Sequence, residues 1–411
     1  MSEGIKSEGI KVKTLDDLIA AGLISGKKVL MRVDFNVPIN NGKIESDIRI
    51  QAALPSIKKV LDANGKLILS SHLGRPKEGE FDESASLAPV AAHLSDLINI
   101  PVRIDREALN SDPACVSFGE NSKEVVLLGN VRFNKGEKDN SDDLAKKMAQ
   151  LCDVYVHDAF GTAHRAQAST HGVAKYAKIV CAGPLLMSEI KALEKSLSNP
   201  KRPLVAIVGG SKVSSKLTVL KELSNKVDQL IVGGGIANTF LAAKGFNVGK
   251  SLYEKDLISD AKDIINNIES KGGVVPLPVD VRVAKEFDIN AKAEIKSVDS
   301  LDDDDQILDV GPKSSENLSS LVLGAGTIVW NGPIGVFEFP EFSQGTKSLA
   351  LDVAKSDAFS IAGGGDTLSA IDQFGVKNKI SYISTGGGAF LEYLEGKELP
   401  ALSILKQRYE D

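Results

Sequence analysis

Short runs of apolar residues alternate along the chain with longer segments whose apolar residues repeat at helical spacing. The first half has a strand-like segment at 28–34, followed at 48–61 by an amphipathic helical pattern that Gly65 closes. The alternation continues with strand-like runs at 66–70, 102–105, 125–128 and 154–156 and helical segments at 87–97 and 142–151. Strands that alternate with helices over short connections predict βαβ units and a parallel sheet covered on both faces.

The same rhythm resumes beyond residue 199, and we expect strands there at 204–208, 229–232, 274–281, 327–330, 359–362 and 381–384. Residues 188–197 have a helical pattern between the breaks Gly183-Pro184 and Asn199-Pro200, which is typical of a connector between domains. The predicted fold is therefore α/β, with two Rossmann-like lobes that are each a mostly parallel sheet flanked by helices. A connecting helix joins the lobes, and we expect a cleft between them.

Composition narrows the class of protein. A chain of 411 residues is long enough for two domains, and 42% hydrophobic with 25% charged residues is typical of a soluble globular protein. The formal charge of −6 argues against non-specific binding to nucleic acid or to an acidic membrane. Three cysteines without a C-x-x-C pair favour a reducing compartment, and we find no signal peptide, so we expect a cytoplasmic protein.

Arginine gathers in the first half, where seven of the ten arginines and all five histidines precede residue 172. In open α/β sheets, ligands bind beyond the carboxyl ends of the strands, so polar residues that follow strands are candidates for a site. One such set comprises Asn36, Arg49, His72, Arg75, Arg132 and Arg165. Any one of these arginines alone fits an ordinary surface residue. Together they predict a site for a compact anion with carboxylate and phosphate groups.

Glycine takes the corresponding place in the second half. Gly-rich turns follow the predicted strands at 209–210, 233–235, 363–365 and 386–388, and polar turns occur at 309–313 and 331–338. From Ser211 on, the pattern predicts a helix with Lys212 and Lys216 on one face, and a helix N-terminus that follows a strand attracts phosphate. The alternative is a plain turn with solvated lysines. With Asp366 as a magnesium ligand, these turns favour a Mg²⁺–nucleotide site.

Other nucleotide motifs fail on spacing. Residues 244–251 resemble a Walker A loop but place three residues, not four, between Gly245 and Gly249, and no G-x-G-x-x-G occurs. The acidic stretch 299–305 has five Asp in seven residues, and we interpret it as a solvated loop rather than a metal site.

The motifs at 32–38, 71–76, 158–165, 209–213, 330–338 and 363–367 resemble, in order, the signatures of the phosphoglycerate kinase family. The resemblance runs from about residue 12 to the C-terminus. It implies reversible phosphoryl transfer from 1,3-bisphosphoglycerate to ADP, giving 3-phosphoglycerate and ATP, with Mg²⁺ as cofactor. It also implies a monomer with a phosphoglycerate lobe (1–184), a connecting helix (185–198), a Mg²⁺–nucleotide lobe (199–398) and a C-terminal segment (399–411) that returns to the first lobe.

The resemblance also assigns residues. The phosphoglycerate would be bound by Asp34, Phe35, Asn36, Arg49, His72, Leu73, Gly74, Arg75, Arg132 and Arg165. The nucleotide would be bound by Gly210, Lys212, Lys216, Gly234, Gly235, Gly311, Asn331, Pro333, Glu338, Gly364, Gly365, Asp366 and Thr367, and the metal by Asp366. The residues acting on the phosphoryl group in transit would be Arg49, Lys212, Gly365 and Gly388. The alternatives are a non-catalytic two-lobed protein that binds nucleotide and anion, and an acyl-phosphate-forming ligase on another α/β scaffold.

Overall fold

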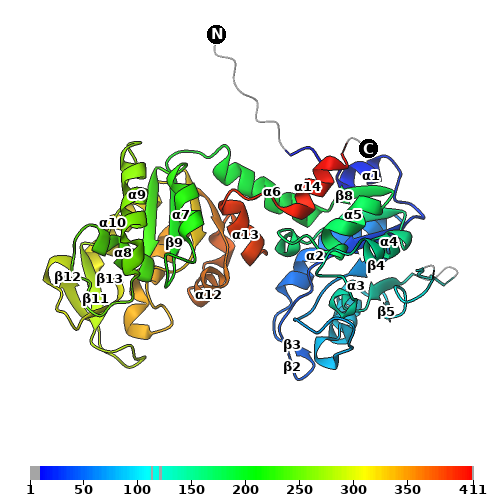
Figure 1. Ribbon diagram of the computed structural model, residues 1–411, viewed down its shortest axis with the longest axis horizontal. Coiled ribbons are helices and arrows are strands. Elements are labelled where there is room, and N and C mark those ends of the chain that lie inside the picture. The colour runs from blue at the N-terminus through cyan, green and yellow to red at the C-terminus, as the bar shows by residue number, and fades with distance from the viewer. Residues whose placement is uncertain (1–9, 113, 120–122, 410–411) are drawn as a thin grey trace, which may run out of the picture. The chain divides into compact units, whose positions relative to one another are not determined.

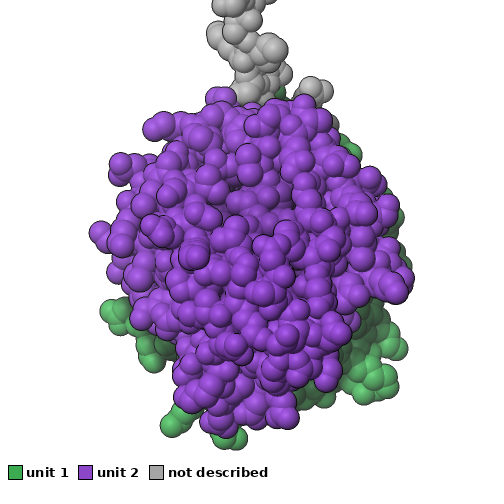
Figure 2. Space-filling model, turned by 90° about the vertical axis from the view of Figure 1, so that its left-hand side faces the viewer, with its two compact units in different colours: residues 1–190, 398–411 green, residues 191–397 purple. Residues whose placement is uncertain are grey.

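The computed structural model describes residues 10–112, 114–119 and 123–409 (Figure 1). The chain divides into two compact units, which Figure 2 colours separately: unit 1 comprises residues 1–190 and 398–411, and unit 2 comprises residues 191–397. Among the described residues, no helix is long and apolar enough to cross a membrane.

Unit 1 is built on a six-stranded parallel sheet in the order β5-β6-β4-β1-β7-β8. Its strands are β1 (Lys28–Arg32), β4 (Lys66–Ser70), β5 (Val102–Asp105), β6 (Val125–Leu128), β7 (Val154–His157) and β8 (Ile179–Ala182), and a short hairpin pairs β2 (Ile39–Asn40) with β3 (Lys43–Ile44). Its helices are α1 (Leu15–Ala20), α2 (Ile48–Asp62), α3 (Ala88–Ile98), α4 (Asp142–Gln150), α5 (Val173–Tyr176) and α14 (Pro400–Gln407).

Helix α2 covers the sheet of unit 1 with its apolar face. Ile50, Ala53, Ile57 and Val60 recur at spacings of three and four residues and are all buried in one core with β1 and β4. The strands end at one edge of this sheet, where the polar segments that follow β1, β4, β6 and β7 therefore meet.

The C-terminal helix α14 belongs to unit 1 and lies against α5 and β8 (Figure 1). Arg408, just beyond it, donates hydrogen bonds to the carbonyl oxygens of Ala174 (2.7 Å) and Ala177 (3.1 Å). The long helix α6 (Pro184–Leu197) begins at Pro184, four residues before the predicted start, and contains the boundary between the units.

Unit 2 carries a five-stranded parallel sheet in the order β10-β9-β14-β15-β16. Its strands are β9 (Leu204–Gly209), β10 (Gln229–Gly233), β14 (Thr327–Asn331), β15 (Phe359–Ala362) and β16 (Tyr382–Ile383). Its helices are α7 (Leu217–Ser224), α8 (Gly235–Ala243), α9 (Ile258–Glu269), α10 (Pro312–Leu323), α11 (Gln344–Lys355), α12 (Gly365–Gln373) and α13 (Gly387–Leu394). Two parallel sheets flanked by helices confirm the predicted α/β class.

One predicted strand is wrong. Residues 274–281 do not form a strand of the parallel sheet, where Val274 makes only an isolated bridge to Gln229. Instead, β11 (Asp280–Ala284) is the centre of a small antiparallel sheet with β12 (Glu294–Ser297) and β13 (Gln306–Val310), which the sequence pattern did not indicate. Pro276 and Pro278 have no N–H to donate to a ladder, which explains why the strand begins only after them.

Candidate active site

A cluster of guanidinium groups lies at the carboxyl-end edge of the unit 1 sheet. Arg32 ends β1, Arg49 lies in the first turn of α2, Arg132 lies in a 3₁₀ turn after β6, and Arg165 follows β7. Arg49, Arg132 and Arg165 were predicted for this site, whereas Arg32 was missed. Arg32 begins the Arg32-Val-Asp-Phe-Asn motif, and this position could have indicated that it belongs to the site.

Asp34 and Asn36 orient Arg49. The Arg49 Nη1 donates to the Asn36 carbonyl oxygen (2.8 Å) and lies 3.4 Å from Oδ2 of Asp34. The side-chain oxygen of Asn36 accepts a hydrogen bond from the Gly74 N–H (2.8 Å), which joins the segments that follow β1 and β4. The guanidinium of Arg49 is thus anchored while its side chain stays 34% exposed, accessible to a ligand.

His72 is a neutral member of this cluster. Its ring is buried, and burial together with the positive charges of Arg32, Arg132, Arg165 and Arg49 lowers its pKa far below the ordinary value. The Nη2 of Arg32 lies 3.2 Å from the His72 Nδ1. The ring therefore contributes hydrogen bonding, and no charge, at neutral pH.

The charges of the cluster are unbalanced. Burial and the neighbouring guanidinium groups, Arg165 first and then Arg32, lower the pKa of Arg132 to about 10. The carboxylates that act on this cluster are the buried Glu137, which raises the pKa of Arg132 and Arg32, and Asp34, which raises that of Arg32, so positive groups outnumber negative ones. An anionic ligand would relieve this repulsion.

The remaining predicted residues of unit 1 contribute mainly through the backbone. Phe35 is fully buried and its N–H donates to Ser71 Oγ (2.8 Å), and Leu73 is buried with its carbonyl bound by Asn130 (2.7 Å). The Gly74 carbonyl accepts from Arg132, and Gly74 has a φ of 62°, which favours glycine. Arg75 is exposed, and its positive charge contributes to lowering the pKa of Arg132.

In unit 2, the loop after β9 differs from its prediction. Residues 211–216 are not helical, because α7 begins at Leu217 with Lys216 as its N-cap residue. Lys212 and Lys216 therefore do not share a helix face. Glu254 holds the loop by accepting from the Ser214 N–H (2.7 Å) and the Ser214 hydroxyl (2.6 Å).

Lys216 points at the end of β14. Its Nζ donates to the side-chain oxygen of Asn331 (2.6 Å), whose amide nitrogen donates to the Gly363 carbonyl (2.7 Å). Burial lowers the pKa of Lys216, although Asp366 and Glu395 oppose that shift. Lys212 is exposed.

A cavity of about 780 Å³ opens beside these turns within unit 2. Predicted residues in its lining are Gly210, Gly234, Gly235, Pro333, Glu338 and Asp366. Sequence reasoning missed its apolar walls, which include Leu252, Phe287, Ile307, Leu308, Val336 and Phe339. Phe287 and Leu252 are 62% and 55% exposed, so large apolar side chains face the solvent at this place. A cavity with apolar walls and a few polar groups is typical of a small-molecule site.

The glycines of unit 2 serve two different purposes. A Cβ at Gly209 would come within 1.7 Å of the Pro333 carbonyl oxygen, and one at Gly235 within 2.0 Å of the Ser211 carbonyl oxygen, so packing between loops requires these glycines. Gly365 and Gly387 have no neighbouring atom within 4 Å of such a Cβ. Backbone approach to a ligand remains a reason for glycine at these two helix N-termini.

Several other predicted residues have internal partners. Gly311 precedes α10, whose first N–H groups are bound by the Asp280 carboxylate: Lys313 at 3.1 Å and Ser314 at 2.8 Å. The Thr367 hydroxyl accepts from the Gly332 N–H (2.7 Å) and donates to the Gly363 carbonyl (2.9 Å). Gly364 is the N-cap of α12, and Gly388 lies in the first turn of α13.

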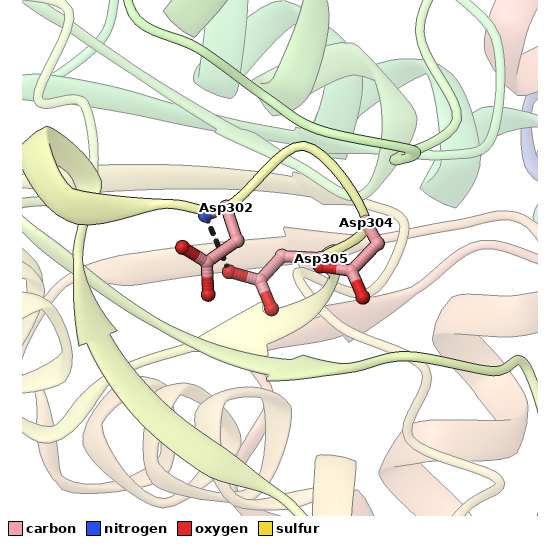
Figure 3. A group of neighbouring side chains, drawn as sticks. All are labelled: Asp302, Asp304 and Asp305. Atoms are coloured by element: carbon pink, nitrogen blue, oxygen red, sulfur yellow. Dashed lines mark hydrogen bonds between the residues drawn. The ribbon is translucent and has the colours of Figure 1, made fainter.

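Among the described residues, one group of three acidic side chains is close enough to hold a metal ion: Asp302, Asp304 and Asp305 (Figure 3). Lysines already balance these charges, since Lys285 lies 2.6 Å from Asp304 and Lys296 lies 2.7 Å from Asp302. The predicted metal ligand Asp366 is a different residue, exposed in the first turn of α12 and in the cavity lining. One carboxylate suits Mg²⁺, which usually keeps several waters and takes further ligands from substrate phosphates.

Comparisons with known proteins agree on one family. The family model for phosphoglycerate kinase matches residues 19–397. The chain is 59% identical over 385 residues to the phosphoglycerate kinase of Francisella philomiragia subsp. philomiragia, covering 94% of this chain and 97% of that one, and 58% identical over 385 residues to that of Francisella tularensis subsp. novicida with the same coverage.

Solved structures are also similar. The structure of phosphoglycerate kinase from Coxiella burnetii has a TM-score of 0.91 and 53% identity, covering 97% of this chain and 99% of that one. The crystal structure of the enzyme from Pyrococcus horikoshii has a TM-score of 0.79 and 31% identity with the same coverage.

Proposed function

This chain belongs to the phosphoglycerate kinase family, and from that premise we propose how its residues share the work of the reaction. Its membership makes it a glycolytic phosphotransferase whose substrates are the phosphoglycerates and ADP or ATP. We propose that the carboxyl group of 3-phosphoglycerate accepts the phosphoryl group from ATP in the reverse direction. The forward reaction then transfers the phosphoryl group of the acyl phosphate of 1,3-bisphosphoglycerate to ADP.

The observation that carries this proposal is the surplus of guanidinium groups around the neutral His72. A bisphosphoglycerate offers several oxyanions within a few ångströms, which suits guanidinium forks spread over one rim. Asp34 and Asn36 would hold Arg49 in place and bind the glycerate oxygens. His72, Arg75, Arg132 and Arg165 would bind its carboxyl and phosphate groups, with Gly74 fixing the turn.

The nucleotide belongs to unit 2 in this proposal. The apolar cavity wall would cover the base, Glu338 at its rim would bind the ribose, and Lys216 and Asn331 would bind phosphate oxygens. Asp366 would hold Mg²⁺, whose charge, when it is bound, offsets that of the nucleotide phosphates. Burial lowers the pKa of the nearby Lys216 amine, and the charge of Asp366 opposes that shift, which favours the positive form that would bind the same phosphates.

The chemical step needs position and charge more than covalent help from the protein. A β-phosphate oxygen of ADP attacks the acyl phosphate, and because that oxygen is already an anion, no general base has to remove a proton. Arg49 and Lys212, together with the N–H groups near Gly365 and Gly388, would neutralise the equatorial oxygens of the phosphoryl group in transit.

Direct transfer requires the ligands of the two units to meet during the reaction. We propose that the connecting segment around α6 permits this closure and that closure excludes water, which would otherwise hydrolyse the acyl phosphate. We also propose that the chain acts as a monomer in the cytoplasm, without a nucleic-acid partner.

An assay of 3-phosphoglycerate-dependent ATP consumption, coupled to removal of the acyl phosphate, tests the proposal. Arg49→Ala should lower turnover by on the order of 10²-fold while leaving ADP affinity unchanged, because the lost charge acts on the group in transit. Arg106→Ala is the matched control, since Arg106 is an exposed arginine of unit 1 that stacks on Phe81 outside the cluster. Turnover of Arg49→Ala near that of wild type would refute the assignment.

A further inference from the structure

A buried network of hydrogen-bonded polar groups includes one arginine of the guanidinium cluster of unit 1. It consists of Glu137, Ser169, Arg32 and His72, which are 0%, 1%, 0% and 4% exposed. The four residues come from separate parts of the chain: the turn after Arg132, the helical turn at 168–172, the end of β1 and the segment after β4. Predictions from sequence included only His72.

At one end of this network, the donor and the acceptor of each hydrogen bond follow from the chemistry of the side chains. Arginine can only donate, so Arg32 Nε donates to the Ser169 Oγ (2.9 Å). The hydroxyl proton of Ser169 is then directed to Glu137 Oε1 (2.6 Å), and the Ser169 N–H donates to Glu137 Oε2 (3.0 Å). Both oxygens of Glu137 accept hydrogen bonds, which is the role of an ionised carboxylate.

At the other end of this network, the contact with Arg32 determines the tautomer of His72. Arg32 Nη2 lies 3.2 Å from His72 Nδ1, and since the guanidinium is the donor, Nδ1 must carry a lone pair. The same guanidinium donates to the carbonyl of Val33 through Nη1, so its orientation is fixed on both sides. A neutral imidazole with a lone pair on Nδ1 carries its proton on Nε2.

We propose that Glu137 is a positioning residue of the anion site: through Ser169 and Arg32 it fixes His72 as the neutral tautomer whose Nε2–H donates a hydrogen bond to the bound phosphoglycerate. The inference rests on the proposed role of His72 in that site. A neutral donor can bind an oxyanion of the substrate without adding another positive charge to a cluster that already repels itself. Burial raises the pKa of Glu137, whereas the charge of Arg32 and the two hydrogen bonds from Ser169 oppose that shift, and the carboxylate in turn raises the pKa of Arg32 and Arg132.

Two substitutions disrupt the hydrogen-bond network in different ways. In Glu137→Gln, the side-chain amide has one acceptor oxygen for the two donors of Ser169, so one donor loses its partner and Arg32 loses the stronger of its two counter-charges, the other being Asp34. Ser169→Ala removes the hydroxyl link and leaves the carboxylate in place. Either change weakens or removes the hydrogen bond that anchors Arg32 at Nε and leaves the guanidinium held at Val33 alone, so the contact with His72 Nδ1 should loosen and His72 should lose its fixed tautomer in both.

Glu78→Gln is the matched control. Glu78 accepts hydrogen bonds from the N–H groups of Gly136 (3.2 Å) and Lys138 (3.0 Å), so it anchors the same turn that carries Glu137. It does not contact Ser169 or Arg32 in any hydrogen bond of the described residues. An effect that arises merely from loosening the turn should therefore appear in this variant too.

The experiment is ¹⁵N NMR of histidine-labelled protein at neutral pH, with the His72 signals assigned from a His72→Gln sample, combined with calorimetry of 3-phosphoglycerate and of ADP. Wild type and Glu78→Gln should show His72 with a bare Nδ1 and a protonated Nε2. Glu137→Gln and Ser169→Ala should show mixed tautomers and about tenfold weaker 3-phosphoglycerate binding, with ADP binding unchanged. Ser169→Ala keeps the test valid if Glu137→Gln does not fold.

An unchanged His72 tautomer in Ser169→Ala, or a 3-phosphoglycerate affinity within twofold of wild type, would overturn the inference. A wild-type protein that binds no 3-phosphoglycerate would instead overturn the proposed function. The tautomer is measured without ligand, so the two failures are distinguishable.

Discussion

Asp309 should make the stability of unit 2 depend on pH. Asp309 is the penultimate residue of β13 and is 2% exposed, and one of its carboxylate oxygens accepts from the Gly345 N–H (2.7 Å) at the start of α11. Its other oxygen, Oδ1, accepts no hydrogen bond from any described residue. Burial raises the pKa of Asp309 to about 7, against the smaller lowering effects of the backbone hydrogen bonds and of Arg282.

The sign and size of the effect follow from linkage. The unfolded carboxyl has the ordinary pKa of 3.8, so the folded state holds its proton more tightly. The stabilisation is complete below that value and is lost as the pH rises to about 7, at about 1.4 kcal/mol per pH unit. Between pH 5 and pH 7, the free energy of unfolding should therefore fall by about 2 kcal/mol relative to a variant that does not titrate, because half of the Asp309 carboxyl groups are already ionised at pH 7.

The variant is Asp309→Asn, whose amide oxygen can still accept from Gly345. Trp330 is the single tryptophan of the chain and is fully buried in the unit 2 core, so its fluorescence during urea unfolding reports on this unit. Asp263→Asn, on the exposed face of α9, is the matched control and should give a pH-independent difference from wild type.

The difference in unfolding free energy between wild type and Asp309→Asn should change steadily from pH 5 to pH 7 and then level off. A difference that stays constant over this range would refute the reasoning, because it would mean that Asp309 ionises in the folded state as it does in water.

Two further predictions concern the metal and the C-terminus. Asp366→Asn should weaken Mg²⁺–ADP binding in calorimetry, whereas Asp304→Asn, in the lysine-balanced cluster, should not, and equal affinities for all three proteins would exclude Asp366 as the metal ligand. Arg408→Ala should destabilise the packing of α14 on α5 by about 1–3 kcal/mol, because buried carbonyls lose their donor, and faster hydrogen exchange in 173–177 and 400–407 would show it, while unchanged exchange would contradict it.

Except for β8, which was not predicted, the parallel strands were predictable because their sequences are short apolar runs rich in Val, Ile and Leu that are followed by glycine or polar residues. The bounds of β4, β5 and β6 equal the predicted ranges, and α2 differs by one residue. In such a sheet the residue after each strand lies at the ligand edge, which is why the pattern alone gathered Asn36, His72 and Arg132.

Each failure has an identifiable cause. The segment after Gly210 has helical spacing, but Glu254 binds the Ser214 backbone and hydroxyl, an interaction from 40 residues away that delays the helix until Leu217. The antiparallel strand β12 is mostly exposed, so it lacks the apolar alternation that indicates a strand.

Buried charges were the hardest to predict. Glu137 and Asp309 occupy positions where a single sequence shows an ordinary polar residue, and their roles come from partners such as Ser169 and Gly345 that tertiary packing supplies. The apolar wall of the unit 2 cavity was missed for a similar reason, because Phe287 and Leu252 come from loops without a periodic pattern.

The central claim is that the guanidinium cluster of unit 1 is the phosphoglycerate site. A crystal structure of the protein with 3-phosphoglycerate and no nucleotide tests it most directly. The account predicts ligand density in contact with Arg49, His72 and Arg132, with the His72 Nε2 within hydrogen-bond distance of a ligand oxygen. Density for the ligand in the unit 2 cavity, with the arginine cluster left to solvent, would contradict it.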